Sequence, residues 1–182
     1  MLLFAVKEMG SIEGLTIRTF RDEDLDRVVY INRTCLPENY GTYFFLEIHE
    51  NYPKTFLVAE VDGRVVGYIM CRTEYGSSNF KRLSIVKKGH VISIAVLPEY
   101  RRRGIGTALL THCLKNLEEY GAKECFLEVR VSNEVAKSLY SKLGFKSVGK
   151  IGGYYFDGED ALIMSVKLPL EMQARTPSES QR

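Results

Sequence analysis

"VLPEYRRRGIGTALL", residues 96–110, connects an apolar stretch to a helical pattern through a loop rich in arginine and glycine. Pro98 should stop the preceding strand, and apolar residues recur at helical spacing after Gly104. A helix N-terminus leaves backbone N–H groups unpaired and carries partial positive charge, so it attracts anions. Gly104 and Gly106 would let a phosphate approach the backbone closely. The segment indicates either a phosphate-binding loop or a solvated basic start of a helix.

The segments on either side of this loop predict a parallel crossover. "HVISIAVL" (90–97) is almost wholly apolar, as expected for a strand buried on both faces. "ECFLEVRV" (124–131) alternates like a second strand, and "SNEVAKSLYSKLGF" (132–145) follows as a capped helix. Strand, helix and strand in this order imply a right-handed connection between parallel strands.

The rest of the chain adds antiparallel elements and more helices. The Asp62-Gly63 pair is a strong hairpin signal between two strand patterns. The expected elements are a strand at 15–20, a helix at 21–36, a short helix within 37–53, strands at 55–61 and 64–74, a mobile loop at 75–89, and a turn and strand within 154–168. The sequence therefore predicts an α/β (α+β) fold, with a mixed central sheet and helices on both faces.

Composition limits the class of protein. A chain of 182 residues with 45% hydrophobic residues can form one domain. Lysine and arginine exceed aspartate and glutamate only 25 to 23, which disfavours nucleic-acid binding through Arg101–Arg103. The four cysteines form no C-x-x-C pair, which fits a reduced cytoplasmic setting better than a disulfide framework or a zinc site. No stretch approaches the length of a membrane span, and residues 173–182 are expected to form a disordered tail.

Several motifs resemble those of the GNAT acetyltransferases. Arg101, Gly104 and Gly106 match the R/Q-x-x-G-x-G/A pyrophosphate loop of that family, whereas the P-loop and the dinucleotide fingerprint do not fit. The helix at 132–145 resembles the second cofactor segment of the family, with Asn133 and Tyr140 at the matching positions.

Two further motifs narrow the resemblance to one branch of the family. "LPENY" (36–40) and "YYFDGEDA" (154–161) are similar to segments of protein N-terminal acetyltransferases, above all the archaeal homologues of the eukaryotic NatA catalytic subunit. The resemblance implies a GNAT domain over 15–168, with an N-terminal extension (1–14) and a C-terminal tail (169–182).

The resemblance implies acetyl transfer from acetyl-CoA to the α-amine of protein N-termini, with no metal. In this fold the two parallel strands splay apart, and the pantetheine arm enters between them. The implied cofactor-binding residues are Ile94, Ala95, Val96, Arg102, Arg103, Gly104, Ile105, Gly106, Thr107, Asn133 and Tyr140. Lysine or small-molecule amines as acceptors remain an alternative, and so does a non-catalytic CoA-binding or scaffold subunit.

Four residues are the candidate catalytic groups. An α-amine has a pKa of about 8, so a base gives modest but useful help. By resemblance, Glu38 lines the peptide site, His90 and Glu128 lie near the attacking amine, and Tyr140 lies near the cofactor sulfur. Glu38 could instead be a solvated turn residue, His90 a partly buried histidine, and Tyr140 a core residue. Glu128 could simply pair with Arg130.

The acceptor side is expected to be rich in tyrosine. By resemblance, Tyr40, Tyr154 and Tyr155 contact the first residues of the acceptor, although they could equally form an aromatic cluster. Direct attack of the amine fits better than an acyl-cysteine route, because no cysteine has a neighbouring base in sequence. The expected partners are protein N-termini or nascent chains, whereas ribosome association, an auxiliary subunit and a homodimer remain open.

Overall fold

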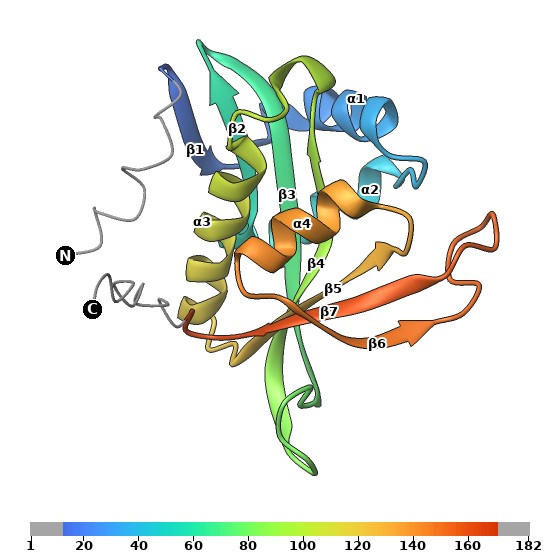
Figure 1. Ribbon diagram of the computed structural model, residues 1–182. Coiled ribbons are helices and arrows are strands. Elements are labelled where there is room, and N and C mark those ends of the chain that lie inside the picture. The colour runs from blue at the N-terminus through green and yellow to red at the C-terminus, as the bar shows by residue number, and fades with distance from the viewer. Residues whose placement is uncertain (1–12, 171–182) are drawn as a thin grey trace, which may run out of the picture.

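The computed structural model describes residues 13–170 (Figure 1). Most of the expected N-terminal extension and C-terminal tail, residues 1–12 and 171–182, lies outside the described residues. The elements are β1 (Leu15–Thr19), the 3-10 helix η1 (Asp22–Asp24), α1 (Leu25–Cys35), α2 (Thr42–Asn51), η2 (Pro53–Thr55), β2 (Phe56–Val61), β3 (Arg64–Ser77), β4 (Ile85–Val96), η3 (Pro98–Tyr100), α3 (Ile105–Glu119), β5 (Glu124–Arg130), α4 (Glu134–Lys142), β6 (Lys146–Ile151) and β7 (Ala161–Lys167).

One sheet of seven strands forms the centre of the structure, in the order β1-β2-β3-β4-β5-β7-β6. Neighbouring strands in the sheet run antiparallel, except β4 and β5, which run parallel. Two apolar clusters cover its faces: one contains residues of α3 and α4, and the other contains residues of α1 and α2. The predicted mixed sheet with helices on both faces is confirmed.

The parallel strands β4 and β5 separate soon after they meet. They pair only from Lys88–Glu124 to His90–Phe126, and Figure 1 shows them diverging beyond this point. Ile92 has no partner in β3, because the register shifts there by one residue. Such a bulge bends a strand locally. The predicted splay is thus present, and it begins just after His90.

The segment expected to be a mobile loop at 75–89 is a loop only at 78–84, because residues 75–77 and 85–89 belong to β3 and β4, so that expectation was wrong at both ends of the segment. β3 and β4 stay paired as far as Ser77 and Ile85, and their hairpin projects from the sheet in Figure 1. Glu124 is buried at the start of β5, accepts a hydrogen bond from the Ser78 hydroxyl and binds the backbone N–H of Asn79 at 2.8 Å. Pairing between distant segments decides this structure, whereas the local residues favour a loop.

The short strand β6 was missed as well. Its residues alternate weakly and remain mostly exposed, and it pairs only with β7. An edge strand of this kind leaves little hydrophobic signal in the sequence.

Candidate active site

The arginine-glycine loop forms a helix N-terminus with free backbone amides. Arg102 and Gly104 adopt left-handed backbone angles, with φ of 63° and 84°, and α3 begins at Ile105. The first helical hydrogen bond runs from the Ala108 N–H to the Gly104 carbonyl at 2.9 Å. The N–H groups of the turn before Ala108 therefore have no acceptor inside the helix. This is the geometry of an anion site made by backbone rather than by side chains.

The side chains of the loop serve mainly to shape it. Arg101 Nε donates to the Val96 carbonyl at 2.8 Å, and the Arg103 guanidinium lies 5.4 Å from the centre of the Tyr100 ring. A Cβ atom on Gly106 would lie 3.3 Å from Leu139 Cδ2 in α4. Gly106 thus allows close packing of α3 on α4, a role in addition to the one expected from the sequence.

The backbone of β4 next to this loop is held close to β3. Ile94 and Ala95 pair with Ile69 and Tyr68 of β3, and β5 does not pair with them. A Cβ atom on Gly67 would lie only 2.9 Å from the Ala95 carbonyl oxygen, so only glycine fits at 67 without a shift. The sequence analysis did not identify Gly67, and a glycine inside a strand pattern was the available signal.

The helix α4 carries two of the predicted site residues. Asn133 caps its N-terminus, where its side-chain oxygen accepts the Ala136 N–H at 3.1 Å. Tyr140 is buried with 6% of its surface exposed, and burial raises the pKa of its phenol. The hydroxyl therefore keeps its proton at neutral pH and can act as a donor.

His90 and Glu128 form a hydrogen-bonded pair where β4 and β5 begin to part. His90 Nε2 lies 2.7 Å from Glu128 Oε2, and both side chains are 15% exposed. The imidazole stacks on Phe126 with ring centres 4.3 Å apart. Glu128 therefore does not pair with Arg130, the alternative that the sequence left open.

Arg130 instead joins the two loops that carry the predicted acceptor residues. Its guanidinium contacts Glu38 at 2.5 Å, Asp157 at 2.7 Å and Glu159 at 2.8 Å. It also lies 3.9 Å from the centre of the Tyr155 ring. Glu38 therefore has a cation, the Arg130 guanidinium, as its partner.

Glu159 is held by a second contact besides Arg130. Hydrogen bonding from Ser132, followed by Arg130, lowers the pKa of the Glu159 carboxyl to about 2. The carboxylate therefore stays ionised across the neutral range, and the tie between the loops persists there.

The buried side-chain amide of Asn32 holds the "LPENY" loop in place. Asn32 of α1 is 1% exposed and donates through Nδ2 to the Tyr68 hydroxyl at 2.9 Å and to the Glu38 carbonyl at 3.3 Å. Its Oδ1 accepts the Tyr40 N–H at 3.4 Å, and the Tyr68 hydroxyl continues the chain to Ser93 at 2.7 Å. The sequence analysis did not identify Asn32, which lies on the buried face of α1 with Val28 and Ile31.

The three predicted acceptor tyrosines lie on the two tied loops. Tyr40 donates to the Ile92 carbonyl at 3.2 Å and stacks on Phe44. Tyr154 and Tyr155 meet edge to face with ring centres 5.0 Å apart. Burial raises the pKa of all three phenols, so they remain neutral near pH 7.

Three of the four cysteines are poor candidates for an acyl carrier. Cys71, Cys113 and Cys125 are fully buried, and burial raises the pKa of the Cys71 and Cys125 thiols well above its usual range. A thiol that keeps its proton is a weak nucleophile. Among residues 13–170, no group of three or more His, Cys, Asp or Glu side chains could hold a metal ion.

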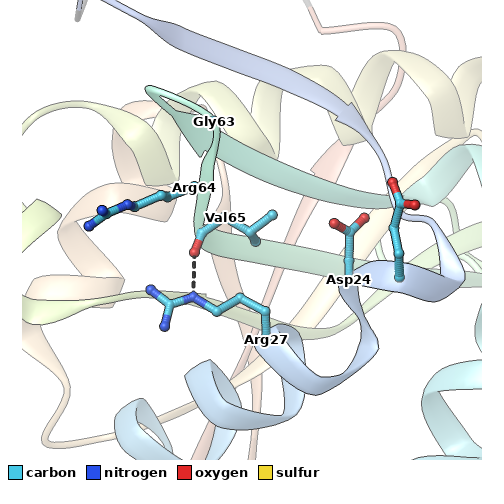
Figure 2. A pocket seen from close by; sticks show the side chains of 6 residues that line it. Asp24, Arg27, Gly63, Arg64 and Val65 are labelled. Atoms are coloured by element: carbon cyan, nitrogen blue, oxygen red, sulfur yellow. Dashed lines mark hydrogen bonds between the residues drawn. The ribbon is translucent and has the colours of Figure 1, made fainter.

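A pocket elsewhere on the surface involves none of these groups. Figure 2 shows it beside the β2–β3 turn, where Arg27 Nε donates to the Val65 carbonyl at 2.8 Å. Asp24 and Arg64 also line it. The predicted chemistry is therefore not located there.

The fold and this arrangement of residues define a class of acetyltransferases. Residues 25–145 match the acetyltransferase (GNAT) family, and the chain belongs to that family. An N-alpha-acetyltransferase of Sulfurisphaera tokodaii is 58% identical over 154 residues, which cover 84% of this chain and 92% of that protein. The predicted family branch and the prediction of an acetyltransferase are confirmed.

Solved structures show the same fold. Ard1 from Thermoplasma volcanium is 32% identical with a TM-score of 0.73, covering 85% of this chain and 97% of that chain. Arabidopsis thaliana Naa50, in complex with the bisubstrate analogue CoA-Ac-MVNAL, is 26% identical with a TM-score of 0.73, covering 85% and 99%. No helix within residues 13–170 is both long and apolar enough to cross a membrane.

Proposed function

We propose that this protein transfers the acetyl group of acetyl-CoA to the free α-amine of protein N-termini, by direct attack in a ternary complex. The observation that carries the proposal is the His90–Glu128 pair at 2.7 Å, placed where β4 and β5 part. The Naa50 complex supports it, because its single ligand combines CoA with an acetylated peptide.

The cofactor would bind along β4 and the N-terminus of α3. Backbone groups of Ile94, Ala95 and Val96 would pair with the pantetheine arm, and the amides of residues 102–107 would hold the pyrophosphate. Asn133 would act mainly by capping α4.

We assign Glu128 as the base that accepts the proton of the attacking amine. His90 Nε2 is already engaged with Glu128 Oε2, whereas Glu128 Oε1 makes no hydrogen bond within the part of the chain described. This oxygen can accept the proton as the amine nitrogen attacks the acetyl carbon. The carbon–sulfur bond then breaks, and Tyr140 gives its proton to the departing thiolate.

Glu38 takes a supporting role on the acceptor side. Its ion pair with Arg130 ties the "LPENY" loop to the loop that holds Tyr154 and Tyr155. The three tyrosines would then form the walls around the first residues of the acceptor. The domain would span 15–168 and act in the cytoplasm, where nascent N-termini emerge.

Two peptides test the proposed function. One has a free α-amine and no lysine, and the other has a blocked α-amine and one lysine. With acetyl-CoA, CoA should be released only with the first peptide. Equal rates with both would favour a lysine acetyltransferase, and CoA binding with no release from either would favour a non-catalytic subunit.

A further inference from the structure

One nitrogen of the His90 ring is buried without a partner. Nε2 is bonded to Glu128, but Nδ1 has no hydrogen-bond partner among the described residues. Buried polar atoms in folded proteins nearly always have one. The carboxylate of Glu74 is close by, with Oε2 3.8 Å from Nδ1, just beyond hydrogen-bonding distance.

Strand register places Glu74 beside the ring. Arg72 in β3 lies directly opposite His90 in β4, so Glu74, two residues along β3, is its diagonal neighbour on the same face. Glu74 Oε2 also lies 3.3 Å from Arg72 Nη2, and Arg72 Nε is a second buried nitrogen without a partner. The Glu74 side chain is 38% exposed, so it can rotate at little cost.

Among the charged groups around the ring, only Glu74 can accept a hydrogen bond from Nδ1. Glu128 already binds Nε2. Arg72 is a donor only, and so is Lys88, which lies over the Phe126 ring and donates to the Ser77 carbonyl.

We propose that Glu74 is a positioning residue that accepts a hydrogen bond from Nδ1–H of His90. A small rotation closes the remaining distance, and the His90 ring then lies hydrogen-bonded between two carboxylates. With both ring nitrogens bonded, the His90 ring is held in one orientation. Its Nε2–H then stays directed at Glu128 Oε2, and this contact keeps Glu128 Oε1 directed toward the amine. Glu74, His90 and Glu128 thus form a chain of three side chains across β3, β4 and β5.

Nitrogen NMR tests the contact without any activity. The full-length protein is labelled with ¹⁵N at its three histidines, and His90→Gln identifies the His90 signals. The Nδ1 signal of His90 should shift between the parent and Glu74→Gln, because the substitution removes the carboxylate that accepts the Nδ1–H. Glu60→Gln is the matched control, since Glu60 is a half-buried strand carboxylate paired with Arg18. An identical Nδ1 signal in the parent and in Glu74→Gln would overturn the proposal.

Kinetics tests what the contact does, and this part alone rests on the proposed function. Glu74→Gln should lower kcat about tenfold, a fraction of what a general base contributes. The KM for acetyl-CoA should stay unchanged, and Glu74→Asp should recover part of the rate. An unchanged kcat in Glu74→Gln would refute the positioning role even where the NMR signal moves. Absence of peptide acetylation by the parent would instead count against the proposed function and leave the NMR result standing.

Discussion

Replacing Asn32 by alanine should both destabilise the fold and weaken peptide binding. The side chain is 1% exposed and makes three hydrogen bonds, to the Tyr68 hydroxyl, the Glu38 carbonyl and the Tyr40 N–H. A hydrogen bond contributes about 1 kcal/mol, and the two longer ones should give less. With the small cavity added, the free energy of unfolding should fall by about 2 to 3 kcal/mol. For a domain of this size Tm should drop by about 5 to 10 °C.

The same change releases the "LPENY" loop, so its effect on the two substrates should differ. The peptide KM should rise about tenfold, equivalent to ~1.4 kcal/mol, while the Kd of acetyl-CoA stays within about twofold. Thermal melts and initial rates measure the two effects. Asn51→Ala is the control, because Asn51 is exposed and bonds only within α2, to the Glu47 carbonyl. A normal peptide KM together with the expected drop in Tm would show that Asn32 supports the core alone.

Three further outcomes follow from the site. Gly104→Val should strongly raise the Kd of acetyl-CoA in calorimetric titration, because the φ of 84° at Gly104 and the close approach of a phosphate both exclude a side chain. Arg102→Ala should raise this Kd less. Equal affinity in Gly104→Val and the parent would refute the phosphate loop. Tyr140→Phe should reduce turnover more than cofactor affinity, and unchanged turnover where chemistry limits the rate would make Tyr140 a core residue. Arg130→Met should raise the peptide KM in initial-rate assays while acetyl-CoA affinity is kept, since Glu38 loses its partner; added salt should narrow the difference between this variant and the parent, and an unaltered peptide KM would contradict the tie between the loops.

Local patterns predicted the elements that hold the cofactor. The apolar run at 90–97 forms the second half of β4, and the stop at Pro98 and the helical spacing after Gly104 appear where expected, as η3 and α3. These signals depend on residues within a few positions of one another, so they can be read from one segment.

Contacts between distant segments explain what the sequence did not predict. Residues 75–77 and 85–89 include two glycines, a serine and two lysines, and only their pairing across the β3–β4 hairpin makes them strand. Arg130 meets Glu38 across 92 positions, and nothing in the sequence separates that partner from Glu128, two residues away. The pairing of His90 with Phe126 decides which carboxylate Arg130 contacts, because this register brings Glu128 to the imidazole instead.

The most direct test of the account is the rate of peptide acetylation by Glu128→Gln at neutral pH. The substitution keeps the size of the side chain and removes the charge that would receive the amine proton. We predict that kcat/KM for a peptide with a free α-amine falls by about 100-fold or more, with the Kd of acetyl-CoA unchanged. A kcat/KM within about twofold of the parent would contradict the assignment of Glu128 as the base.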